Sequence, residues 1–146
     1  MELLLNKNDK DYPDVAVVIS DVENLKRNLL LFTQIKDLKI PTILVINMAD
    51  RMDRKGISLD VPAMEKKLDT KIALVSTRKN TGIDRIKELI ADYKNVSSKP
   101  LLDPARISPA YFERLKKTFP QNDLYKLWLV ITQDVNFMPI EKKRIE

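Results

Sequence analysis

Three short apolar runs constrain the fold of this chain more than any other feature of its sequence. They are rich in β-branched residues and lie at Val15–Ile19, Thr42–Ile46 and Ile72–Val75. None of them alternates polar with apolar residues, which is typical of strands buried on both faces of a parallel sheet. Segments with a helical spacing of apolar residues separate and follow the runs. This order predicts an α/β fold, in which a parallel sheet of three strands with flanking helices is built from right-handed βαβ units.

Local start signals support the helices that this fold requires. Apolar residues recur at helical spacing from residue 25 to residue 35. Asp60 is expected to cap a second helix that ends near Leu68. Thr81–Asp84 has the form of a capping box ahead of a third helix. Each predicted strand is therefore expected to lead into a helix.

The composition changes beyond the third predicted helix. The stretch Val96–Pro100 is typical of a linker. Ser108–Pro109 then predicts the start of a helix, and Asn122 is expected to cap another. No strand pattern follows. We therefore expect an α/β domain over residues 1–95 and a small all-helical domain over residues 96–146.

The composition also excludes several kinds of chemistry. The 146 residues include two glycines, no cysteine and no histidine. Gly56 and Gly82 stand alone, whereas a phosphate loop of the GxxxxGK[ST] or GxGxxG form needs clustered glycines that let the backbone approach phosphate oxygens. Thiol nucleophiles and histidine-based triads are excluded, and transition-metal sites lose their preferred ligands. We assign no catalytic residue and no metal site.

Charge and hydropathy add weaker constraints. The formal net charge of +5 is modest, so nucleic acid is not an expected partner. No apolar run approaches the length of a membrane span, about 18 residues. An alternative function is a non-catalytic module that binds a protein or a nucleic acid through basic helices on a βα scaffold. An ordinary small-molecule enzyme lacks a convincing acid–base pair or nucleophile.

Polar residues follow the second and third predicted strands, at the edge of an open α/β sheet where ligands bind. The candidates are Asn47, Met48, Ala49 and Asp50 after the second strand, and Ser76, Thr77 and Arg78 after the third. A carboxylate at Asp50 can accept two parallel hydrogen bonds from guanine N1–H and N2–H, whereas adenine would leave it unsatisfied. Asn47 would brace the loop and face the base, while Ser76 and the Thr77 amide would close over guanine O6. The alternative is structural: Asn47 and Asp50 would form an Asx turn that caps the next segment.

Several of these stretches carry a family resemblance. Asp21–Leu29 has the form Asp-x-x-Asn-Leu-x-Arg-Asn-Leu, Ile40–Pro41 follows it, and Asn47–Asp50 has the form Asn-Met-x-Asp. Further matches are Lys55–Ile57, Ser76–Arg78 and, in the helical part, Leu124–Leu129. Together these motifs resemble the ferrous iron transport protein B (FeoB) family, from about Tyr12 to Phe137.

The resemblance implies a membrane protein of bacteria and archaea that takes up ferrous iron. In that family a cytoplasmic GTP-binding domain and a helical regulatory domain are joined to a transmembrane permease. The resemblance therefore implies GTP or GDP as the ligand and a permease domain of the same parent chain as the partner. It also implies a location on the cytoplasmic face of the bacterial inner membrane, with a partial GTPase-like sheet in this chain.

The sequence departs from the family pattern at the phosphate-binding half. The phosphate loop, both switches and hence the Mg²⁺ site are expected to precede Met1 in a longer parent protein, and the transmembrane part to follow Glu146. The isolated chain is therefore expected not to hydrolyse GTP, and to bind guanine nucleotides with an affinity of about 1 mM at best. The first strand would lack a neighbour, so we expect self-association through an apolar edge at Val15–Ile19.

Overall fold

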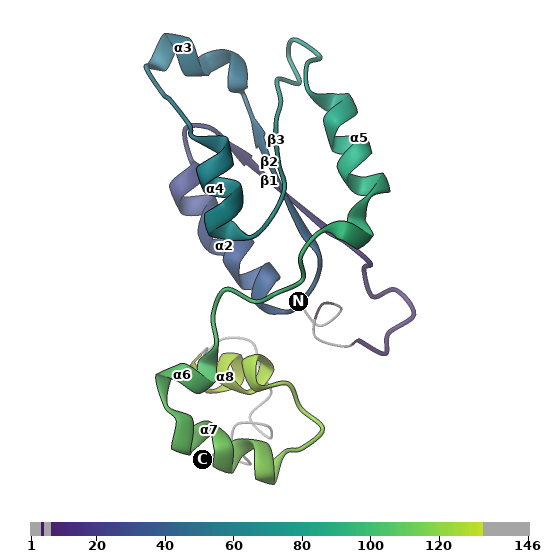
Figure 1. Cartoon of the computed structure of the whole chain (residues 1–146), viewed down its shortest axis with the longest axis vertical. Coiled ribbons are helices and arrows are strands. Elements are labelled where there is room, and N and C mark those ends of the chain that lie inside the picture. Colours follow the sequence, from purple (N-terminus) through teal and green to yellow (C-terminus); the bar gives the residue numbers. More distant parts are fainter. Residues whose placement is uncertain (1–3, 5–6, 133–146) are drawn as a thin grey trace. The chain divides into compact units, whose positions relative to one another are not determined.

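The computed structural model describes Leu4 and residues 7–132, which belong to two compact units that divide after Leu101. The elements of the first unit are β1 (Ala16–Asp21), α2 (Leu25–Asp37), β2 (Thr42–Asn47), the 3₁₀ helix η1 (Ala49–Arg51), α3 (Met52–Lys55), α4 (Val61–Leu68), β3 (Ile72–Leu74), α5 (Ile83–Ala91) and the 3₁₀ helix η2 (Tyr93–Asn95) (Figure 1). Those of the second unit are α6 (Pro104–Ile107), α7 (Pro109–Thr118) and α8 (Leu124–Thr132).

The three strands form one parallel sheet in the order β1-β2-β3. Along the β1–β2 pair the register runs from Ala16 opposite Thr42 to Asp21 opposite Asn47, and β3 pairs with the middle of β2. β2 is buried from residue 42 to residue 46, as a central strand must be. The predicted parallel sheet of three strands with flanking helices is confirmed.

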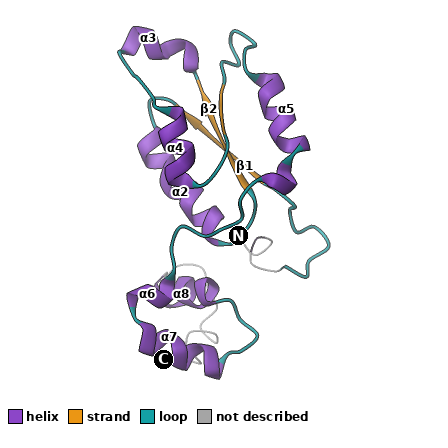
Figure 2. Ribbon diagram, viewed as in Figure 1, coloured by secondary structure: helices purple, strands orange, loops and turns teal. Residues whose placement is uncertain are grey.

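Helices cover both faces of this sheet (Figure 2). α2 and α4 lie on one face, and α5 lies on the other. The core between the sheet and the α2–α4 layer contains Val18, Val22, Leu25, Phe32, Leu44, Ile46 and Ile72. The core on the α5 face contains Ile43, Val45, Ala73, Val75, Leu89 and Val96. Burial on both faces is the physical reason why the strand sequences lack polar alternation.

The two edges of the sheet differ in how they are protected. On β3, the outward-facing backbone N–H of Ile72 donates to Oε1 of Glu65 at 2.9 Å, so a side chain from α4 occupies this edge. On β1, the side chain of Ile19 is 66% exposed. The expectation that the first strand is buried on both faces is wrong at this position, because α5 covers β2 and β3 rather than Ile19.

The start signals of the helices in the first unit had mixed outcomes. Asp60 caps α4 as predicted, because its Oδ1 accepts from the backbone N–H of Ala63 at 3.0 Å. The capping box predicted at Thr81–Asp84 is wrong. The N-cap of α5 is Gly82, in a left-handed conformation and without a side-chain cap bond, while the backbone of Thr81 pairs with Ser76.

The second unit is a small helical cluster. Phe112 and Leu115 of α7 and Leu127 of α8 are buried together. The helix start at Ser108–Pro109 is confirmed, but the cap of α8 is Asp123 rather than Asn122, because Asp123 Oδ1 accepts from the Tyr125 amide at 2.9 Å. The predicted helical domain beyond residue 132 lies outside the described residues.

The compact units divide six residues later than the composition suggests. Val96, placed in the linker by its neighbours in the sequence, is buried in the core on the α5 face. The backbone N–H of Leu101 donates to Oδ1 of Asp37 at 2.7 Å. These two contacts tie residues 96–101 to the first unit.

We predict that Phe32→Ala destabilises the chain by about 3 to 5 kcal/mol, because Phe32 is completely buried under the sheet and its loss leaves a cavity. Leu30→Ala, in the same helix but 65% exposed, is the matched control and should change the free energy of unfolding by no more than about 0.5 kcal/mol. Urea denaturation measures both. Equal effects at the two positions would contradict the packing of α2 described above.

Candidate functional site

Two loops meet at the carboxyl ends of β2 and β3. The first begins after Asn47, the last residue of β2, and contains Met48, Ala49 and Asp50, and the second contains Ser76, Thr77 and Arg78. The backbone N–H of Ala49 donates to the carbonyl of Val75 at 3.0 Å, which extends the pairing of the two strands into the loops. All seven residues selected from the sequence therefore lie at the end of β2 or in these two adjacent loops.

Met48 turns the chain from β2 into η1. Its φ of 62° lies in the left-handed region, which non-glycine residues enter at some energetic cost. Its side chain is packed against the core under α2 and α4. This packing holds the strained turn, and the turn places Asp50 in the 3₁₀ helix that follows.

Asp50 is held by the second loop. The Ser76 hydroxyl donates to Asp50 Oδ1 at 2.7 Å, and Ser76 is itself buried and accepts from the backbone N–H of Lys79 at 3.2 Å. Arg78 Nε lies 4.0 Å from Asp50 Oδ2, and the Asp50 side chain is 5% exposed. The Ser76 hydrogen bond, with the positive charges of Arg78 and Lys79, holds the pKa of Asp50 below its ordinary value. The carboxylate is therefore ionised and fixed at neutral pH.

Asn47 joins the two loops through its side-chain amide. Its Oδ1 accepts from the backbone N–H of Thr77 at 3.2 Å, and its Nδ2 donates to the Thr77 hydroxyl at 3.3 Å. The Thr77 N–H, expected to face guanine O6, donates to Asn47 in this structure. A base oxygen would have to replace Asn47 Oδ1 as the acceptor.

The structural alternative, in which Asn47 and Asp50 cap the next segment, is not what the described residues show. Neither η1 nor α3 has a side-chain hydrogen bond at its cap. Both side chains bind the Ser76–Thr77 loop instead. Their shared role in this structure is to connect two strand ends.

A third loop, between β1 and α2, supports the first two. The backbone N–H of Val22 donates to the carbonyl of Asn47 at 3.1 Å, and Arg51 Nη1 lies 3.2 Å from Glu23 Oε1. Sequence reasoning missed Glu23 and Arg51. The available signal was the alignment of the strand ends, since Asp21 lies opposite Asn47 and brings the residues after each strand together.

Asp21 organises this third loop. Its carboxylate accepts from the side-chain amide of Asn24 and, at 2.7 Å, from the Asn24 backbone N–H. These hydrogen bonds lower the pKa of Asp21. Asn28, one turn further along α2, donates to the Ser20 hydroxyl at 3.1 Å. The start of α2 is thus fastened to the end of β1.

Gly82 closes the second loop at a position where only glycine fits. Its φ is 80°, and a Cβ there would lie 2.2 Å from the carbonyl oxygen of Leu74. The Ser76–Thr81 bridge precedes it. Gly82 therefore serves the close return of this loop over the end of β3.

The described residues offer no evident metal site. Among residues 7–132, histidine, cysteine, aspartate and glutamate side chains do not form a group of three or more that could hold an ion.

The arrangement of strands and helices defines a class of protein. Three parallel strands with flanking helices, followed by further helices, have the fold of FeoB cytosolic domains and of their G-domain. A family model described as "Ferrous iron transport protein B" matches residues 2–90, which is more than half of the chain. The chain belongs to the ferrous iron transport protein B (FeoB) family.

Curated relatives agree with this assignment. The Fe(2+) transporter FeoB of Escherichia coli K12 is 37% identical over 100 residues, covering 63% of this chain and 13% of the relative. The Fe(2+) transporter FeoB of Leptospira biflexa is 32% identical over 90 residues, covering 62% of this chain and 13% of the relative. The chain thus matches about one eighth of the length of these transporters.

Solved structures show the same fold. The cytosolic domain of the T. maritima FeoB iron transporter, in its apo form, has a TM-score of 0.80 at 19% identity, and the match covers 99% of this chain and 57% of that one. A mutant of S. thermophilus NFeoB bound to GDP has a TM-score of 0.71 at 21% identity, and the match covers 99% of this chain and 59% of that one. The FeoB G-domain of Methanococcus jannaschii has a TM-score of 0.55 at 30% identity, with 61% and 64% covered.

We predict that Ser76→Ala raises the pKa of Asp50 toward its ordinary value of 3.8, because the variant lacks the hydroxyl that stabilises the carboxylate. A lowered pKa in the folded state contributes stability above the ordinary pKa, and this contribution is lost as the pH falls through the folded pKa. The variant should therefore lose less stability on acidification than the parent chain. A carboxyl-carbon NMR titration measures the pKa directly.

The matched control for this titration is Thr77→Val, which removes a hydroxyl that bonds to Asn47 rather than to Asp50. Its Asp50 should titrate as in the parent chain. An unchanged pKa in Ser76→Ala would show that the hydrogen bond does not hold the carboxylate.

Proposed function

We propose that this chain is the base-recognising part of the G domain of a GTP-binding ferrous iron transporter, followed by part of its helical domain. One observation carries the proposal: the Asp50 carboxylate is ionised and is oriented by the Ser76 hydroxyl. Both residues lie just beyond the carboxyl ends of adjacent strands. Membership of the FeoB family supports the wider context.

Guanine is the base that such a carboxylate recognises best. Its N1–H and N2–H point in parallel and can donate to the two oxygens of Asp50. The hydrogen bond from Ser76 occupies one lone pair of Oδ1, so both oxygens can still accept. Adenine has no such pair of donors, and a buried carboxylate facing it would be left unsatisfied. Asn47, Met48, Ala49, Ser76, Thr77 and Arg78 would form the surrounding loops.

The activity of the whole protein belongs to the same proposal. Relatives described as Fe(2+) transporters suggest that the nucleotide domain serves iron transport through a membrane permease domain of the same protein, at the cytoplasmic face of the membrane. No helix among the described residues has the length and apolar character needed to cross a membrane. Phosphate binding, Mg²⁺ and hydrolysis would depend on phosphate-loop and switch motifs that this sequence does not contain.

We predict that Asp50→Asn changes base preference from guanine to xanthine by about tenfold or more. Xanthine has a carbonyl at C2 where guanine has an amino group, so an asparagine amide can donate to it while a carboxylate cannot. Titration of the labelled chain with millimolar GDP, XDP and ADP, followed by amide NMR shifts at residues 47–50 and 76–78, measures the preference.

Asp53→Asn is the matched control, because it neutralises an exposed carboxylate in the adjacent helix α3. It should keep the guanine preference of the parent chain. The same preference in Asp50→Asn as in the parent chain would refute the role of Asp50. Micromolar binding of GDP to the unmodified chain would refute the proposed dependence on the missing phosphate contacts.

We further propose that the isolated chain self-associates through β1. Parallel pairing uses one side of this strand for β2, and Ile19 is largely exposed on it. Edge strands with exposed apolar residues tend to pair with other chains.

Ile19→Lys should weaken this association by about tenfold or more, because burial of an isoleucine is replaced by a charge. Leu30→Lys, at an equally exposed position of α2, is the control and should change it less. Sedimentation velocity over a range of concentrations measures both, and a monomer at high concentration would count against the proposal.

A further inference from the structure

The segment Ser97–Leu101 leads from the first unit toward the second and is held by the last turn of α2. That turn contains Lys36 and Asp37, both charged and both buried. Their hydrogen bonds to the segment cross 61 and 64 positions of the sequence. The contacts are therefore tertiary, and they act where the chain leaves the first unit.

Lys36 joins three parts of the first unit. Its side chain is completely buried, and its Nζ donates to the carbonyl of Asp69 at 2.5 Å and to that of Ser97 at 3.0 Å. Asp69 is the C-cap of α4, so one ammonium group links α2, α4 and the exit segment. Burial of a cation is costly unless its donors are satisfied, and here it lowers the pKa of Lys36.

Asp37 holds the far end of the same segment. It is 4% exposed, and its Oδ1 accepts from the Leu101 backbone N–H at 2.7 Å. At the near end, the Ser97 hydroxyl also donates to the Asp69 carboxylate. The segment is thus fixed at Ser97 and at Leu101 by polar contacts with consecutive residues of one helix.

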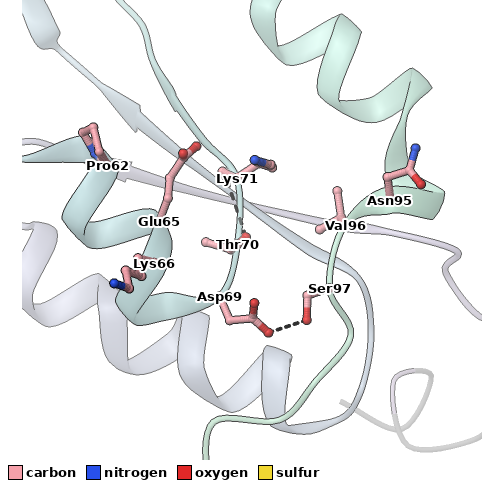
Figure 3. A pocket seen from close by; sticks show the side chains of 9 residues that line it. All are labelled: Pro62, Glu65, Lys66, Asp69, Thr70, Lys71, Asn95, Val96 and Ser97. Atoms are coloured by element: carbon pink, nitrogen blue, oxygen red, sulfur yellow. Dashed lines mark hydrogen bonds between the residues drawn. The ribbon is translucent and has the colours of Figure 1, made fainter.

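A pocket lies beside these contacts, between α4 and the start of the exit segment. The pocket has a volume of about 330 Å³ and lies between α4, the approach to β3 and residues 95–97 (Figure 3). Asp69 and Ser97 point toward one another across it, joined by their hydrogen bond. Val96 is anchored in the core, and the hydrogen bonds of Ser97 and Leu101 hold the residues that follow it.

We propose that Lys36 and Asp37 form a latch that fixes the exit segment Ser97–Leu101, and that this latch opens as one local unit while the sheet stays folded. A few hydrogen bonds beside an open pocket can break together without disturbing the sheet, because the core residues lie elsewhere. α2 begins at the loop that contacts Asn47 and ends at the latch, about 20 Å away at 1.5 Å per residue. The latch itself does not depend on guanine binding.

Lys36→Met tests the latch, because methionine keeps the apolar stem and lacks the ammonium group. Asp37→Ala tests its other half. Hydrogen exchange followed by NMR should show the Leu101 amide exchanging about tenfold or more faster in both variants. Amides of Ile43 and Val45 in the sheet should keep their protection. Lys26→Met, on the exposed face of α2, is the control and should leave Leu101 as in the parent chain.

The absence of cysteine from the sequence permits one further measurement. A triple variant combines Lys36→Met with Asp69→Cys and Ser97→Cys. Oxidation of the cysteine pair to a disulfide should restore slow exchange of the Leu101 amide, while the reduced pair should not.

Two results would overturn the latch. Leu101 exchange could be unchanged in both variants. Sheet amides could also lose protection together with Leu101, in which case Lys36 stabilises the whole unit rather than the exit segment. Neither of these results involves nucleotide, so a failed latch and a failed guanine site are distinguishable.

Discussion

The pairing of β2 with a strand on each side determines where the polar residues of the first unit lie. Parallel strands end at the same edge of the sheet, so Asp21 lies opposite Asn47. The residues that follow β3 emerge at this same edge. The hydrogen bond from Ala49 to Val75 continues the ladder past the regular strands. The two loops that hold Asp50 are therefore extensions of the sheet, and their geometry depends on its register.

Helix α2 gives this sheet edge a connection to the opposite end of the unit. Its first turn is fastened through Asp21 and Asn24, and its last turn holds the exit segment through Lys36 and Asp37. Phe32, completely buried, anchors the middle of the helix under the sheet. Polar contacts at the ends and apolar packing between them are what allow one helix to serve two distant regions.

Sequence reasoning was accurate where a signal is local or periodic. The apolar runs marked the strands, and Asp60 caps its helix because an aspartate three residues before a free N–H is sufficient. It failed where a long-range contact competes with a local one. Thr81 pairs with Ser76 instead of capping α5, and the Thr77 amide donates to Asn47, thirty residues away. Lys36 gave no signal at all, since a lysine in the last turn of a helix is usually solvated.

The sequence by itself determined the parallel βαβ order, the pair of polar loops and the resemblance to the FeoB family. Apolar runs and short motifs consist of residues that are neighbours in the chain, so they can be recognised without the tertiary structure. Only the tertiary structure decided which of these polar groups bind one another. Ser76 orients Asp50, Glu23 meets Arg51, and Lys36 reaches Ser97. The reason is physical: a hydrogen bond depends on a separation of about 3 Å, and for residues far apart in the chain that separation is set by the packing of the sheet and its helices.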